Sequence, residues 1–143
     1  KGDIQPLYLK DVEDDHGKRL DAPSFIRLMR TLIPATEAGF VVTENVHVMR
    51  VSGREMSHST ETTLVGLRFA AQAACDIARL RMHFVSPQSW KAHYGIKGDK
   101  TGAVARQIAA SLYPARAEEL KRVKDHNRAE SLLIAHYAKD KLA

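Results

Sequence analysis

The stretch FVVTENVHV, residues 40–48, decides the fold. Its β-branched residues and its lack of strong helix formers predict a central strand. Burying an ionised carboxylate without a partner costs several kcal/mol, so Glu44 needs a cation, a hydrogen-bond network or a strand end in water. The cation would be a metal ion or one of the chain's 22 Lys and Arg side chains. The pattern leaves both partners open. Alternation along the strand places Glu44 in a row with four apolar residues: Phe40, Val42, Val46 and Val48.

Helices and strands are expected on both sides of this strand. Asp21 is a good N-cap for a helix that Pro34 ends, and Ser59 or Thr60 begins a long helix that reaches about Leu80. This order predicts an α/β fold with a mixed sheet. The other predicted elements are an edge strand at 4–12, polar segments at 14–18 and 50–59, a strand at 82–85, a helical turn within 86–95, a helix at 100–112 ended by Pro114, a short charged helix at 117–122 and a last helix from Asp125 or His126.

The segment KDHNRAES, residues 124–131, is a second candidate site. His126 and Glu130 are four residues apart and therefore share one face at the start of the last helix, with Asp125 beside them as the predicted N-cap. A His and a Glu at this spacing can share a divalent ion. A carboxylate favoured by the helix dipole, next to a solvated His, explains the same pattern without a ligand.

Length and composition exclude several classes of protein. A chain of 143 residues, 44% of them hydrophobic, is expected to form a single domain around one core. No apolar stretch approaches the roughly 20 residues that span a bilayer, so we expect no membrane segment. Cys75 is the only cysteine, which excludes a disulfide scaffold and a Cys-based zinc site and favours an intracellular setting. The fingerprints of serine hydrolases and dinucleotide-binding proteins are missing.

Charge is distributed unevenly along the chain. Residues 86–143 contain 11 Lys and Arg against 6 Asp and Glu, a net +5, whereas residues 1–85 contain 11 of each and sum to zero. A one-sided basic excess is typical of a protein that binds phosphate backbones, although a solvated basic helix face gives the same count. Trp90 is either a base-stacking ring beside Lys91 or a core anchor. Lys97 and Lys100 precede a predicted helix N-terminus, where phosphate binds well.

The chain contains four characteristic segments: VVTENV, SWKAHYG, DKTGAVARQIAASLYP and KDHNRAESLLIAHY. Together they resemble the RuvC-type Holliday junction resolvases, and most closely the chloroplast-resolvase-like branch of these RNase H-like nucleases. The similarity runs from about residue 20 to the C-terminus. It implies an RNase H-like mixed sheet flanked by helices, and a homodimer that cleaves four-way DNA junctions with Mg²⁺, or with Mn²⁺ in its place. The family's first strand, with a Gly-x-Asp-Pro-Gly pattern, is missing before Lys1, and Asp3 is a poor substitute for its catalytic Asp. We therefore expect residues 1–143 to form one RNase H-like nuclease domain without that strand.

The resemblance also assigns roles to residues. It implies that Glu44, His126 and Glu130 are the catalytic and metal-binding residues of a two-metal hydrolysis, with Asp125 supporting them. A branched-DNA-binding module without cleavage, or a related RNase H-like nuclease or transposase, is the alternative. We expect a DNA-associated location inside the cell, in the cytoplasm, nucleoid or an organelle. The implied DNA-binding residues are Arg50, Arg54, His58, Lys91, Lys97, Lys100 and Arg128.

The candidate dimer contact is a stripe of apolar residues on the long helix: Leu64, Leu67, Ala71, Ala74 and Ala78. Alternatively, this stripe packs on the sheet of its own subunit.

Overall fold

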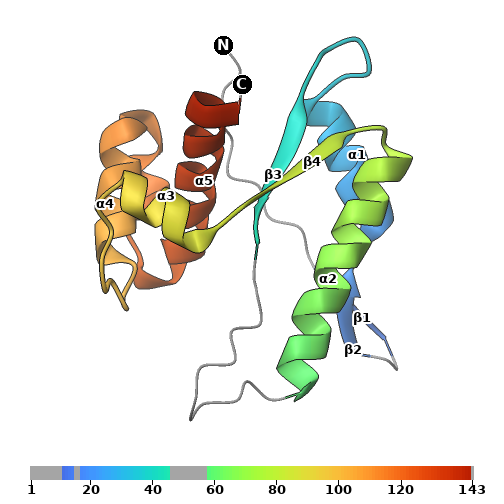
Figure 1. The fold of residues 1–143 in the computed structure, drawn as a ribbon, viewed down its shortest axis with the longest axis horizontal. Helices are drawn as coiled ribbons and strands as arrows, with labels where there is room; N and C mark the ends of the chain where they lie inside the picture. Colours follow the sequence, from blue (N-terminus) through green and yellow to red (C-terminus); the bar gives the residue numbers. More distant parts are fainter. Residues whose placement is uncertain (1–10, 15–16, 46–57, 143) are drawn as a thin grey trace. The chain divides into compact units, whose positions relative to one another are not determined.

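The structure is a computed structural model that describes residues 11–14, 17–45 and 58–142 (Figure 1). The fold is mixed α/β, as predicted, and mostly helical. The described residues form two compact units. The N-terminal unit contains the described residues up to 41 together with 58–83, and the C-terminal unit contains 42–45 and 84–142. Within the described residues, no helix is both long and apolar enough to cross a membrane.

The N-terminal unit begins with a β-hairpin. Strand β1 (Asp11–Asp14) pairs antiparallel with β2 (Gly17–Leu20), with Asp11 opposite Leu20 and Asp14 opposite Gly17. The predicted polar turn at 14–18 was therefore too long, because Asp14, Gly17 and Lys18 belong to the strands. The sequence GKRL has low strand propensity, but pairing with a neighbouring strand can override that preference. Most of the strand predicted at 4–12 lies outside the described residues.

Helix α1 (Ala22–Leu32) begins and ends as predicted. Asp21 caps it: the Ser24 backbone N–H donates to Oδ1 at 3.2 Å, and the Ser24 hydroxyl donates to Oδ2 at 2.6 Å. These two bonds stabilise the charged carboxylate and lower the pKa of Asp21. The helix stops two residues before Pro34, because a proline disfavours the helical conformation of the residue before it.

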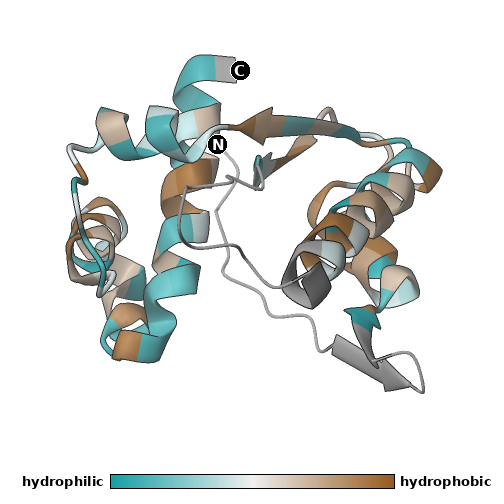
Figure 2. Cartoon of the chain, turned by 60° about the horizontal axis from the view of Figure 1, so that its bottom comes forward, coloured by the Kyte–Doolittle hydropathy of each residue, from teal (hydrophilic) through white to brown (hydrophobic). Residues whose placement is uncertain are grey.

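Helix α2 (His58–Ile77) packs on α1 within the N-terminal unit. It ends three residues before the predicted Leu80, because Arg79 adopts a left-handed φ of 54° and the Leu80 N–H then bonds to the Cys75 carbonyl at 2.9 Å. Ala74 and Ala78 of the proposed dimer stripe are buried, and Ala78 belongs to a core against which residues of α1 pack. Hydrophobic residues, brown in the cartoon of Figure 2, occur along α2. Three of them are exposed: Val65, Phe69 and Ile77.

Strand β3 (Phe40–Glu44) follows α1, and β4 (Arg81–Val85) follows α2. The two strands form a small parallel sheet, in which the Asn45 N–H extends the pairing by donating to the Val85 carbonyl at 2.7 Å. The β4 prediction was correct to within one residue, and β3 begins at Phe40 as predicted. Residues 46–48 of the predicted strand lie outside the described part of the chain.

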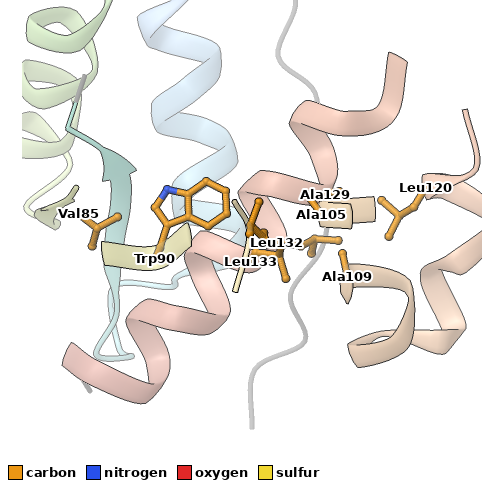
Figure 3. Packing of buried hydrophobic residues seen from close by; sticks show 9 residues of the cluster. Val85, Trp90, Ala105, Ala109, Leu120, Ala129, Leu132 and Leu133 are labelled. Atoms are coloured by element: carbon orange, nitrogen blue, oxygen red, sulfur yellow. The ribbon is translucent and has the colours of Figure 1, made fainter. Parts of the chain in front are cut away.

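The C-terminal unit is built from helices around Trp90. Trp90 is completely buried, against Val85 and against Leu132 and Leu133 of the last helix (Figure 3). The core-anchor interpretation of Trp90 is therefore correct, and base stacking by this ring is excluded by its burial. The helices of this unit are α3 (Pro87–His93), α4 (Ala103–Leu112), the 3-10 helices η1 (Pro114–Leu120) and η2 (Val123–Asp125), and α5 (His126–Leu142).

Two boundaries in this unit differ from the predictions. Helix α4 starts at Ala103 rather than near Lys100, because residues 97–102 form a turn of their own. The charged helix predicted at 117–122 is instead the 3-10 helix η1, which begins directly at Pro114. The start of α5 at His126 agrees with the prediction.

Candidate functional site

Glu44 stands at the end of β3 and contacts α3. Its Oε1 accepts a hydrogen bond from the Trp90 indole Nε1 at 2.9 Å, across 46 residues of chain. Because Trp90 is fully buried, packing fixes the direction of its N–H and thereby the position of this carboxylate oxygen. The indole carries no charge, and no cation among the described residues forms an ion pair with Glu44. The carboxylate is therefore positioned by a neutral donor through Oε1.

Glu130, on α5, contacts the next residue of α3. Its Oε1 lies 3.6 Å from the Nζ of Lys91, and that ammonium also lies 5.1 Å from the centre of the Trp90 ring. The two paired side chains keep 37% and 29% of their surface exposed. Ion pairs at this exposure contribute about 1 kcal/mol or less. The ion pair with Lys91 therefore holds Glu130 only weakly.

His126 is the first residue of α5, one helical turn before Glu130. Its Nδ1 lies 3.0 Å from the Val123 carbonyl oxygen. A carbonyl can only accept a hydrogen bond, so Nδ1 carries the proton and the neutral ring has its lone pair on Nε2. Metal-binding histidines commonly show this arrangement, in which one ring nitrogen donates to a carbonyl and the other is free to bind.

Asp125 does not support these residues. Its Oδ1 accepts from a terminal nitrogen of Arg122 at 2.8 Å, and its Oδ2 accepts from both Nε and the backbone N–H of Arg122 at 3.0 Å. Chiefly through the side-chain bonds, Arg122 lowers the pKa of Asp125 to about 2. Asp125 thus stabilises η2 rather than capping α5 or assisting His126, which corrects the prediction for this residue.

The turn before α4 also differs from the prediction. Asp99 accepts hydrogen bonds from the backbone N–H groups of Thr101 at 3.1 Å, Val104 at 2.9 Å and Ala105 at 3.3 Å. Burial opposes ionisation of Asp99, but the bonds from Ala105, Thr101 and Val104 outweigh it and lower the pKa. The chain's own carboxylate therefore occupies the helix N-terminus where we expected phosphate. The Asp-x-Thr spacing at 99–101 was the available signal, since Asp and Thr commonly close such turns.

The predicted DNA-binding residues fall into three groups. Lys97 and Lys100 are exposed, and Lys91 is partly exposed beside Glu130. The Arg128 side chain is only 16% exposed and donates to the Glu119 carbonyl at 3.3 Å and to its Oε2 at 3.4 Å, so it connects α5 to η1. His58 is the first residue of α2, whereas Arg50 and Arg54 lie outside the described residues.

The predicted site residues are brought together in part. Glu44 and Glu130 contact neighbouring residues of α3, and His126 lies one turn before Glu130. Within residues 11–14, 17–45 and 58–142, no group of three or more His, Cys, Asp or Glu side chains is arranged to hold a metal ion. Asp3 lies outside that part of the chain.

A scan against protein-family models finds no match for this chain. A search of curated proteins finds no match either.

Proposed function

We propose that this chain is a structure-selective endonuclease of the RuvC type, with an RNase H-like fold, that cleaves four-way DNA junctions by metal-dependent phosphodiester hydrolysis. One observation carries the proposal: Glu44 from β3 and Glu130 from α5 contact the adjacent α3 residues Trp90 and Lys91. A strand and a terminal helix that are far apart in the sequence thus supply two carboxylates to one short helix.

By atom type the side chains of Glu44, Glu130 and His126 suit a hard divalent cation, although they form no ready three-ligand group among the described residues. Mg²⁺ and Mn²⁺ prefer carboxylate oxygens, and Mn²⁺ also accepts imidazole nitrogen. Glu44 has no cation partner among the described residues, and the pairing of Glu130 with Lys91 is weak. We propose that Glu44, Glu130 and His126 hold the metal. Bound there, Mg²⁺ would supply an activated water and stabilise the leaving oxygen.

The protein's own residues position the site and the DNA. The Trp90 indole fixes one oxygen of Glu44, and the Val123 carbonyl fixes the ring of His126. Lys91 pairs with Glu130 in the free protein, and we propose that it contacts the scissile phosphate when DNA binds. The exposed Lys97 and Lys100 contribute phosphate contacts that are independent of DNA sequence.

Paired cleavage requires two sites related by a two-fold axis, so we propose a homodimer. Sedimentation equilibrium at micromolar concentration tests this: a dimer is expected, and a strict monomer would contradict it. Ala74 is only 1% exposed in the chain, so a charge introduced there would report on folding rather than on a subunit contact.

The experiment that tests the function is incubation of the protein with labelled DNA and Mg²⁺. The substrates are a four-way junction, a nicked duplex, a linear duplex and an RNA–DNA hybrid of matched sequence. We expect symmetric nicks in the junction and little cleavage of the other three. Cleavage of the hybrid instead would favour a related RNase H-like nuclease, and strand transfer would favour a transposase.

A DNA-binding module without cleavage is the second candidate. The observation in its favour is that Lys91 already neutralises Glu130, while no three-residue metal group occurs in the described part of the chain. In the same assay this candidate predicts tight and selective junction binding without product in either Mg²⁺ or Mn²⁺.

A further inference from the structure

Gly102 lies against His126 with no space for a side chain. A Cβ added at Gly102 would stand 2.4 Å from the Cβ of His126 and 3.3 Å from its Cγ. Two other glycines of the same unit share the left-handed backbone, since φ is 67° at Gly102, 67° at Gly95 and 64° at Gly98. A Cβ at Gly95 or Gly98 would meet nothing within 4 Å. Close contact with His126 therefore distinguishes Gly102 from the other two.

Both sides of this contact are held in place. On one side, Asp99 binds the Thr101, Val104 and Ala105 N–H groups, which fixes the turn that contains Gly102. The Gly102 carbonyl also accepts the first backbone bond of α4, from Arg106 at 3.1 Å. On the other side, the nearest atom is the Cβ of His126, which moves only with the α5 backbone. The turn cannot yield without breaking these bonds, and the Cβ of His126 cannot yield unless the α5 backbone moves.

We propose that Gly102 is a positioning residue for His126. Its missing side chain lets the turn at 97–102 pack directly on the start of α5, and this contact keeps the His126 ring bonded through Nδ1 to Val123 with Nε2 presented outward. This inference rests on the proposed function only in assigning His126 a role in the reaction. A methyl group at position 102 would displace His126 and break its bond to Val123.

The test compares three variants of the full chain: Gly102→Ala, Gly98→Ala and Gly95→Ala. All three place alanine at a left-handed φ, so they share that strain, and only Gly102→Ala adds the contact with His126. The readout is the nitrogen-15 spectrum of the His126 ring, assigned by its loss in His126→Gln and recorded at about pH 9, where imidazoles are generally neutral.

We expect the wild-type protein, Gly98→Ala and Gly95→Ala to show the Nδ1–H tautomer of His126. In Gly102→Ala the Nδ1–H tautomer should no longer be the main form of the His126 ring. An unchanged His126 spectrum in Gly102→Ala, or the same change in Gly98→Ala, would overturn the proposal.

Catalysis provides the second readout. Misplacement of a catalytic group by about 1 Å can reduce a rate roughly 100-fold, so Gly102→Ala should lower kcat for junction cleavage by about that factor with little change in KM. Gly98→Ala should stay within about twofold of wild type. If the wild-type protein cleaves no junction, the proposed function fails, and the His126 spectrum still decides whether Gly102 positions the ring.

A second pair of variants covers the case in which Gly102→Ala does not fold. In His126→Gly the opposing Cβ is gone, so adding Gly102→Ala to that variant should lower Tm no more than Gly98→Ala lowers it in the wild type. A further loss of more than about 5 °C in the double variant would show that something other than His126 excludes the methyl group, and would overturn the proposal.

Discussion

The indole Nε1 of Trp90 donates to Oε1 of Glu44 at 2.9 Å, and the adjacent Lys91 lies 3.6 Å from Glu130. Trp90 is thus both the buried centre of the C-terminal unit and the group that orients a half-buried carboxylate. The packing that stabilises this unit also sets the geometry of the proposed site.

Replacing Trp90 with Phe should weaken both stability and metal binding. The variant removes one hydrogen bond to a carboxylate and leaves a cavity, which together should lower the free energy of unfolding by about 2 kcal/mol or more. Urea denaturation measures this loss. In the folded variant the apparent affinity for Mn²⁺, measured by titration calorimetry, should also fall. An unchanged Mn²⁺ affinity would show that Glu44 is not a metal ligand.

Replacing Lys91 with Gln should have the opposite effect on metal binding. Removing the ammonium beside Glu130 frees its carboxylate and makes the site more negative, so Mn²⁺ affinity should rise while junction affinity falls. Stability should change by about 1 kcal/mol at most, because the pair is partly exposed. Lys121→Gln is the matched control, since it breaks the exposed ion pair with Glu118 and should alter neither affinity. If Lys91→Gln and Lys121→Gln changed Mn²⁺ and junction affinity equally, Lys91 would not lie at the metal site.

The stability of the fold at acidic pH should depend on Asp125. Its pKa in the folded protein, about 2, is below its ordinary value of 3.8, chiefly because Arg122 donates to the charged form. A depressed pKa stabilises the fold above pH 3.8, and the contribution is lost as the pH falls toward 2. Asp125→Asn should therefore lower Tm at neutral pH and flatten the decline of Tm between about pH 4 and 2. The double variant with Arg122→Gln should lose little more than either single one.

The two exposed lysines of the turn before α4 should affect DNA binding through salt dependence. Each Lys that contacts a phosphate releases counterions, so Lys97→Gln and Lys100→Gln should each reduce the slope of log K against log salt concentration by about 1. Both should weaken binding to all junction arms alike. Lys141→Gln, near the exposed end of α5, is the control and should leave the slope unchanged. If none of the three variants changed the salt-dependence slope, Lys97 and Lys100 would not contact the DNA phosphates.

The sequence predicted the elements whose signals are local. Asp21 and Pro34 mark both ends of α1, and the β-branched run from Phe40 predicts β3, because caps, breakers and strand propensity act over a few residues. The hairpin strand β2 was not predicted, since pairing rather than composition forms it.

The candidate site could be predicted only in outline. Periodicity indicated that Glu44 needs a partner, but it could not identify Trp90, which is 46 residues away and reaches Glu44 only through tertiary packing. The pairing of Asp125 with Arg122 was also unpredicted, because at three residues' spacing Arg122 competes with the helix N-terminus for the same carboxylate. Gly102 gave no sequence signal, since its importance depends on what lies opposite it.

The measurement that tests the proposed function most directly is junction cleavage in Mg²⁺ by Glu44→Gln and Glu130→Gln, alongside wild type and Glu118→Gln. Glu118 is a matched control because it is an exposed carboxylate of the same unit, 80% exposed and paired with Lys121. We predict that both site variants bind the junction as tightly as wild type and lose cleavage by at least about 100-fold, while Glu118→Gln cleaves normally. Normal cleavage by either Glu44→Gln or Glu130→Gln would contradict the account.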